Sequence, residues 1–177
     1  MTREKVGDFR FGNETHKLML GDGLYLVTKG KDRRVNAMTI GWGFIGTMWK
    51  RPFFIVAVRL SRHTYRLMEE SDSFTVCLPS KGMTDALDFC GTESGRDHDK
   101  LQELGLTAKK SFLVAAPYIE ECPVHYECKI SFKTIVQQGA LSEEIETGVY
   151  PNRNYHILYY GEILGVYAIK DAEQKLS

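Results

Sequence analysis

A cluster of side chains suited to binding an anion follows an apolar segment near residue 60. The segment Phe53–Val58 contains only apolar residues, and the cluster after it includes Arg59, Ser61, Arg62 and Thr64. Ser61 is a favourable N-cap for a helix that runs to about Glu70. Backbone N–H groups at a helix start, hydroxyls and guanidinium groups together form a phosphate site. The pattern therefore predicts a phosphate site where a strand passes into a helix.

A second segment of the same kind is Ser94–Lys100, with the sequence SGRDHDK. It offers a hydroxyl, a flexible glycine, a guanidinium group and an ammonium group beside another expected helix, which Asp97 would cap. For either segment alone, a capped helix with solvated charges is the better explanation, and the run of Asp97, His98 and Asp99 is read in the same way, so no metal site is predicted. Two such segments in one short chain favour a phosphorylated ligand.

One motif points elsewhere and is rejected. Gly41–Gly46 (GWGFIG) matches the GxGxxG pattern of dinucleotide-binding proteins. In that fold the last glycine opens a helix whose N-terminus faces the pyrophosphate. Only Thr47–Arg51 separates this glycine from Pro52, which is too short for such a helix. We interpret the glycines as points where a strand bends or where a flat ligand approaches the backbone.

Most of the remaining chain predicts strands. The expected strands are a strand–turn–strand unit over Leu18–Thr28, then Asn36–Ile45, Phe53–Val58, Phe74–Leu78, Pro123–Gln138 and Asn154–Ile169. Short helices are expected from Ser61, from Thr84 to Cys90 and from Asp97 to Leu104, with a polar connector at Leu141–Val149. The spacing favours a mainly β, antiparallel fold, a closed or split barrel with a few short helices. Residues 1–177 are expected to form a single domain, with 1–16 as a loosely ordered arm.

Composition restricts the class of partner. The chain has 23 basic and 23 acidic residues and a formal net charge of +0, so no global field attracts nucleic acid or an anionic membrane. No apolar run is long enough to span a bilayer, and the polar start is unlike a signal peptide, which predicts a cytoplasmic location. The four cysteines form no CxxC pair, which argues against a zinc ribbon or an iron–sulfur cluster and favours free thiols.

Several segments, taken in order, resemble a known family. They are NAMTIGWG, the Trp49 before Arg51-Pro52, VAVRLSRHTY, FTVCLPS, DFCGTESGRDHDKL, Cys122-Pro123 with YEC after it, and His156 with YYGEI after it. Together they resemble the flavin reductase-like family with the FMN-binding split barrel, in its flavoredoxin-like branch. The resemblance runs from about Asn36 to about Val166. It implies a homodimer with FMN bound non-covalently near the dimer interface.

The resemblance also implies which residues contact FMN. The strand whose backbone would bind the edge of the isoalloxazine ring contains Asn36, Ala37, Met38, Thr39 and Ile40. The phosphate-binding turn would consist of Arg59, Leu60, Ser61, Arg62 and Thr64. Beside the flavin would lie Cys90 and Gly91, and the second phosphate-facing segment contributes Ser94, Gly95, Arg96 and Lys100. His156 falls where reductase members carry a Gly-Asp-His triplet near the nicotinamide; here the triplet is Asn154-Tyr155-His156.

Three functions remain open from the sequence. The first is an FMN-binding oxidoreductase like NAD(P)H:flavin reductases, in which FMN takes hydride at N5 from NADH or NADPH and passes electrons to a redox partner protein or to free flavin. The second is a flavoredoxin-type electron carrier that binds FMN without efficient use of NAD(P)H. The third is a non-enzymatic barrel that binds another phosphorylated ligand or a haem.

Overall fold

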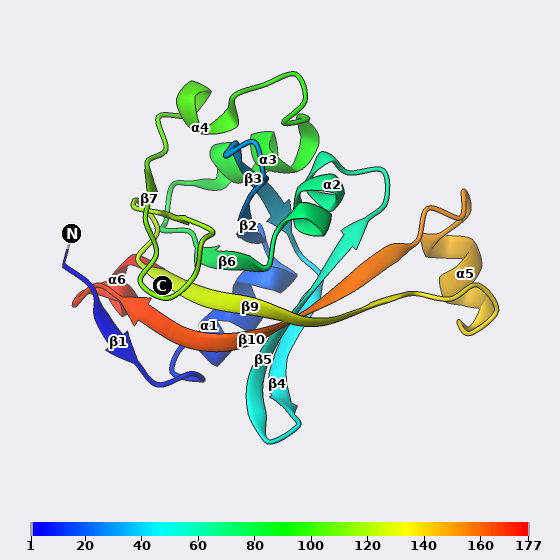
Figure 1. Ribbon diagram of the computed structural model, residues 1–177, viewed down its shortest axis with the longest axis horizontal. Helices are drawn as coiled ribbons and strands as arrows, with labels where there is room; N and C mark the ends of the chain where they lie inside the picture. Colours follow the sequence, from blue (N-terminus) through cyan, green and yellow to red (C-terminus); the bar gives the residue numbers. More distant parts are fainter. Residues whose placement is uncertain (1, 177) are drawn as a thin grey trace.

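The computed structural model describes residues 2–176, which are built around one antiparallel sheet (Figure 1). The strands lie in the order β3, β2, β6, β9, β10, β5 and β4, and β1 also pairs with β10. In that order their bounds are Val35–Ile40, Leu24–Lys29, Ser73–Leu78, Val124–Ile135, His156–Ala168, Arg51–Arg59, Gly43–Met48 and, for β1, Glu4–Val6. A separate pair joins β7 (Ala108–Lys109) to β8 (Tyr118–Ile119). The antiparallel split barrel expected from the sequence is confirmed, because the sheet curls but does not close.

The helices are short. They are α1 (Gly12–Leu20), α2 (His63–Glu70), α3 (Thr84–Thr92), α4 (Lys100–Glu103), α5 (Glu143–Val149) and α6 (Ala172–Leu176). The strand β3 ends the strand order, so its outer edge faces no other strand, and α3 and α4 contact it there (Figure 1). None of the helices described is both long and apolar enough to span a membrane.

Apolar strands build the core. In β5 the segment Phe53–Val58 is buried at every position except Ala57, and all of β6 is buried, as expected for strands covered on both faces. The rings of Phe54, Phe74 and Tyr126 are fully buried. Each such side chain contributes on the order of 1.5–3 kcal/mol by leaving water. The strands that carry the site are therefore fixed by the core beneath them.

The N-terminal region differs from the sequence prediction. A loosely ordered arm over residues 1–16 is wrong for the described part, because β1 pairs with β10 and α1 begins at Gly12. Phe11 and Thr15 are buried, and Thr15 Oγ1 shares a 2.9 Å hydrogen bond with the hydroxyl of Tyr126. The strand expected at 18–20 is instead the last turn of α1, whose buried residues Thr15 and Met19 have helical spacing.

Further along the chain the element types are mostly as predicted, but their starts differ. The rejected GxGxxG segment contains strand β4 and no helix, and the single strand expected over 36–45 is two strands, β3 and β4. Thr84 is the first residue of α3 and donates to Asp22 Oδ2 at 2.8 Å, so it does not cap the helix. The cap of α4 is Asp99 rather than Asp97. The polar connector predicted at 141–149 contains α5, a helix with no buried residue.

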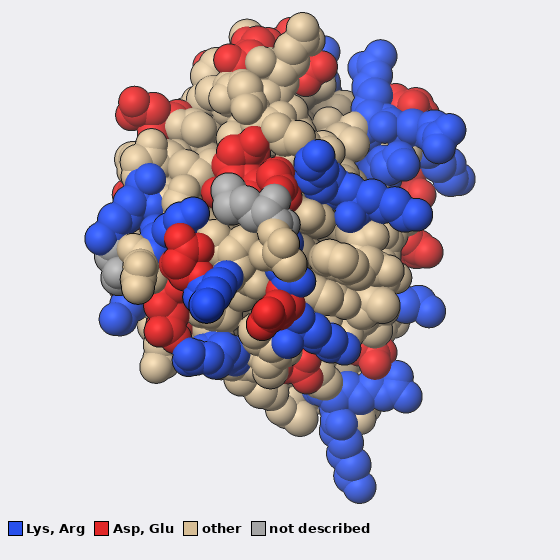
Figure 2. All heavy atoms as spheres, turned by 90° about the vertical axis from the view of Figure 1, so that its left-hand side faces the viewer, with Lys and Arg blue, Asp and Glu red and all other residues tan. Residues whose placement is uncertain are grey.

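Charges on the surface are mixed. Figure 2 shows one face of the molecule, on which Lys and Arg side chains lie among Asp and Glu, with uncharged surface between the charged groups. This agrees with the formal net charge of +0. A local cluster of like charges must therefore be formed by the side chains of particular elements.

A glycine in β10 tests how tightly the sheet packs. A Cβ at Gly161 would lie 2.4 Å from Phe74 Cζ and 2.7 Å from Cys128 Cβ. We expect Gly161→Ala to lower the free energy of unfolding by about 1–3 kcal/mol, measured by chemical denaturation, because the packed ring must move. Gly46→Ala in β4 is the matched control, since its Cβ would meet nothing within 4 Å. Equal stability of the two variants would contradict the packing described.

Candidate anion-binding groove

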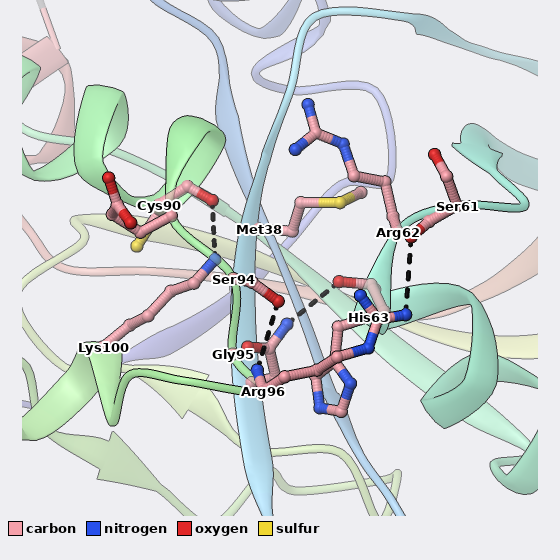
Figure 3. Close-up of a pocket in the computed structure, with 12 residues that line it drawn as sticks. Met38, Ser61, Arg62, His63, Cys90, Ser94, Gly95, Arg96 and Lys100 are labelled. Carbon is pink, nitrogen blue, oxygen red and sulfur yellow. Dashed lines mark hydrogen bonds between the residues drawn. The ribbon is translucent and has the colours of Figure 1, made fainter.

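Adjoining cavities form one groove along the outer edge of β3. The middle one, of about 160 Å³, is lined by Asn36 and Met38 of β3, by residues 61–64, by residues 93–96 and by Lys100, and we call it the anion cavity (Figure 3). It shares Met38 and Arg62 with a neighbouring cavity of about 210 Å³, which we call the tryptophan cavity because Trp42 lines it. On the other side it shares Asn36 and His63 with a cavity of about 290 Å³. The groove thus follows the whole of β3.

The two phosphate-type segments predicted from the sequence meet across the anion cavity. Arg96 Nη2 donates to the backbone carbonyl of Ser61 at 3.4 Å, and the backbone N–H of Arg96 donates to Ser94 Oγ at 3.2 Å (Figure 3). Arg62 points into the space above Met38 in the same view and forms no ion pair among the described residues. The cavity therefore combines hydroxyls and guanidinium groups from segments about thirty residues apart.

Lys100 places a buried amine at the wall of this cavity. Its side chain is 4% exposed, and Nζ donates to the carbonyls of Cys90 at 2.8 Å and Ala37 at 3.2 Å. Burial lowers the pKa of this ammonium group, and the residues described place no carboxylate within ion-pair distance of it. An ammonium group has three donors, so one remains for a ligand. A buried amine without an anionic partner is typical of a site completed by an anion.

The start of α2 is also left open. Ser61 is not its N-cap as predicted: the N-cap is Arg62, whose side chain caps nothing, while Ser61 Oγ accepts from Asn154 Nδ2 at 2.7 Å. The first N–H groups of α2 therefore lack a side-chain cap and lie beside the cavity. Thr64 is held by Asn36 Nδ2 at 2.9 Å. An anion at this point would accept hydrogen bonds from the uncapped N–H groups at the start of α2.

A glycine brings the second segment close to β3. A Cβ at Gly95 would lie 2.1 Å from Asn36 Oδ1 and 3.1 Å from His63 Cδ2, so no larger residue fits without displacing the side chain that holds Thr64. The loop is further held by His98, whose ring nitrogens lie 3.3 Å from Glu93 and 3.0 Å from Glu103. Glu93 is the one carboxylate that lines the anion cavity, and this contact with His98 partners it.

The tryptophan cavity has a different character. Arg59 lies over the rings of Trp42 and Tyr150, with its Cζ at 5.8 and 5.5 Å from their centroids, and donates to the carbonyl of Val149 at 3.3 Å. His156, which faces Arg59 across the β5–β10 pair, has its ring 4.7 Å from that of Trp42. Arg59 shares this cavity with Arg62 but does not line the anion cavity, because it ends β5 on the same face as Ala57, whereas Ser61 is already in the turn.

His156 is neutral at physiological pH. Burial, then the positive charges of Arg59 and Arg62, lowers the pKa of its imidazole to about 4. Tyr150 Oη lies 2.8 Å from Nδ1. We assign the hydroxyl of Tyr150 as the donor, because a phenol donates more readily than a neutral imidazole N–H; this assignment places the ring proton on Nε2, so the ring offers an N–H donor. By contrast, burial raises the pKa of the Cys90 thiol to about 11, which argues against Cys90 as a nucleophile.

Most residues predicted from the sequence line the groove. Those in the anion cavity are Asn36, Met38, Ser61, Arg62, Thr64, Cys90, Ser94, Gly95, Arg96 and Lys100, and those in the tryptophan cavity are Met38, Thr39, Ile40, Arg59, Arg62 and His156. Ala37, Leu60 and Gly91 line neither: Ala37 contributes its carbonyl to Lys100, Leu60 is 37% exposed, and Gly91 approaches Thr39.

Sequence reasoning missed several lining residues. His63 and Glu93 line the anion cavity, and Tyr150 holds His156. For Trp42 the sequence leaves two roles open, stacking near a bound flavin or filling the core; Trp42 is 48% exposed, so it does not fill the core. The position of Trp42 directly after β3 was the available signal, whereas the contact of Tyr150 with His156 depends on the turn before β10 and has no sequence signature.

Comparison with known proteins places the chain in a family. Residues 19–176 match the flavin reductase like domain, so the chain belongs to the flavin reductase-like family. It is 31% identical over 142 residues to an uncharacterized protein of Archaeoglobus fulgidus, covering 80% of this chain and 70% of the relative. Among solved structures it is similar to the flavoredoxin of Desulfovibrio vulgaris (Miyazaki F), with 28% identity, a TM-score of 0.68 and coverage of 84% of this chain and 70% of that one. The flavoredoxin of Methanosarcina acetivorans aligns with a TM-score of 0.66 and 25% identity, over 84% and 68% of the two chains.

The pKa of His156 predicts a pH effect on stability. Because its folded pKa of about 4 lies below the ordinary 6.5, the unfolded chain binds the proton first as pH falls. The free energy of unfolding should therefore drop between about pH 6.5 and pH 4, by up to about 3 kcal/mol from this residue, and the contribution of His156 should not change further below that range. His156→Gln should reduce this pH slope in denaturation experiments. His16→Gln, at an exposed position on α1, is the control, and an unchanged slope in His156→Gln would contradict the assignment.

Proposed function

We propose that this protein is an oxidoreductase that binds FMN without a covalent bond along the outer edge of β3. The observation that carries the proposal is the meeting of two separate phosphate-type segments, residues 61–64 and 94–100, beside that edge. The resemblance to flavoredoxins supports FMN over other phosphorylated ligands.

The residues present fit the phosphate of FMN. The uncapped start of α2, the unpaired guanidinium group of Arg62 and the third donor of Lys100 converge on one cavity, and each is completed by an anion. Asn36 fixes Thr64, and Gly95 permits the close approach of the second segment. A ring system that extends from this phosphate along β3 would reach Met38, which lies at the boundary with the tryptophan cavity.

Bound FMN would supply hydride and electron transfer at N5, and the protein would supply orientation and electrostatics. Arg59 and Arg62 place positive charge at the tryptophan cavity, which stabilises the negative charge of a reduced flavin. Neutral His156 contributes an N–H donor there without adding a further charge.

The triplet Asn154-Tyr155-His156, which ends at the first residue of β10, bears on which of two roles such a flavoprotein has. A reductase would use NADH or NADPH directly, whereas an electron carrier would exchange electrons with a redox partner protein. Asn154 donates to Ser61, and the hydroxyl of Tyr155 donates to Glu146, so both side chains are engaged within the chain. This engagement favours the carrier. Steady-state oxidation of NADH and NADPH with added FMN separates the two roles, because brisk turnover excludes a carrier.

Substitutions in the anion cavity test the proposal. We expect Arg62→Ala and Ser61→Ala together to weaken FMN binding about 10- to 100-fold, because charge-assisted hydrogen bonds of about 1.5–3 kcal/mol are lost. Binding is measured by quenching of FMN fluorescence, and stability by thermal denaturation. Arg66→Ala is the control, because Arg66 lies on the same helix but lines neither the anion nor the tryptophan cavity. Wild-type protein that is colourless and does not bind FMN would refute the proposal, as would equal loss of affinity in the control.

We also propose that the chain forms a homodimer, as the resemblance implies. Exposed apolar side chains gather on β4, the β4–β5 turn and β9, namely Phe44, Met48, Trp49 and Phe132. Trp49 and Phe132 are in edge contact, 6.2 Å between ring centroids. Such a patch is typical of a protein interface.

Sedimentation velocity tests this second proposal. The wild type should sediment as a dimer, and Phe132→Lys should shift it towards the monomer because a charge would enter the apolar contact. Phe9→Lys is the control, since Phe9 is 51% exposed and precedes α1, outside this patch. A wild type that remains monomeric at all concentrations would contradict the dimer.

A further inference from the structure

We propose that the tryptophan cavity binds a single-ring aromatic carboxylate, whose carboxylate pairs with Arg59 and whose ring stacks on Trp42. This inference rests on the proposed function, because it names the class of compound that would lie beside FMN bound along β3. It concerns residues at the far end of the groove from the anion cavity.

The first observation is an arginine without an anionic partner. Arg59 Nη2 donates to the Val149 carbonyl, and over residues 2–176 the arginines in ion pairs are Arg3, Arg10, Arg34, Arg51 and Arg66. A guanidinium group has five N–H donors in a planar fork that matches a carboxylate. Most of these donors remain for a ligand. The rings of Trp42 and Tyr150 against which Arg59 lies hold the fork in place.

The second observation is the sign of the charge around the cavity. Arg59 and Arg62 line it, and among residues 2–176 no acidic side chain does. Neutral His156 adds a donor, because Nδ1 is engaged by Tyr150 and Nε2 has no partner among the described residues. The cavity therefore favours an anionic ligand, and its positive charge disfavours the cationic ring of oxidised nicotinamide.

The third observation is shape. Trp42 is 48% exposed, so part of its indole surface is open for stacking, which planar rings use best. The cavity volume of about 210 Å³ is below the range of about 300–1,000 Å³ typical of sites for drug-sized ligands. One aromatic ring with one carboxylate matches this size, charge and flat surface.

The experiment uses the FMN-loaded protein with benzoate as the probe and benzamide as its uncharged analogue. Binding is followed by the change in the visible spectrum of the flavin and by quenching of tryptophan fluorescence. We expect saturable binding of benzoate, at least about 10-fold tighter than that of benzamide, and weaker binding at high salt. At FMN concentrations that saturate each variant, Arg59→Gln should lose this preference and Arg59→Lys should restore part of it.

Control variants keep the outcomes distinct. Arg51→Gln removes an exposed arginine from the other end of β5, which pairs with Glu162 at 3.0 Å, and should leave benzoate binding unchanged. Trp42→Leu should weaken benzoate and benzamide alike, because it removes the stacking surface and leaves the charge. If the wild type binds no FMN, the proposed function fails. If it binds FMN but binds benzamide as well as benzoate, or if Arg59→Gln keeps the preference for benzoate, the aromatic carboxylate site is refuted while FMN binding stands.

Discussion

The buried amine of Lys100 is the interaction on which the groove depends. It joins α4 to the carbonyl of Ala37 in β3 and to the carbonyl of Cys90 in α3, and so fixes the two helices against the outer edge of the sheet. Two carbonyl dipoles only partly offset the cost of burying a positive charge, which is several kcal/mol. The third N–H donor of the ammonium group therefore favours an anionic ligand at this site. The same side chain thus holds α3 and α4 against β3 and favours an anionic ligand.

The groove separates two electrostatic tasks. In the anion cavity, backbone N–H groups, hydroxyls and cations from two segments surround one point, while Glu93 is occupied by His98. In the tryptophan cavity, Arg59 is held between rings, and His156 is kept neutral by burial and by the arginines beside it. Arg62 lines both cavities, so its positive charge acts on a ligand in either of them. This arrangement suits a ligand with a phosphate at one end and a redox-active ring along β3.

Sequence reasoning grouped the residues that line the groove better than it placed the ends of the elements. Residues 61–64 and 94–100 could be singled out because each segment joins a hydroxyl to basic residues beside an expected helix in a chain with a formal net charge of +0. The cap of α2 could not be predicted, because Ser61 has the right type for a cap and only the contact with Asn154, far along the chain, shows that its hydroxyl is used elsewhere. The start of α1 was not predicted for a related reason, because the burial of Thr15 in this helix depends on its contact with Tyr126 in β9. Local propensity sets the type of an element, and long-range contacts set its boundaries.

The most direct test of the central claim compares FMN with riboflavin, which has the same ring system and no phosphate. If the anion cavity holds the phosphate, the purified protein should bind FMN at least about 100-fold more tightly than riboflavin, since several charge-assisted hydrogen bonds act together. The difference should shrink as salt concentration rises. Equal affinity for the two flavins would contradict the account, because the convergence of Arg62, Lys100 and the start of α2 would then have no role in binding.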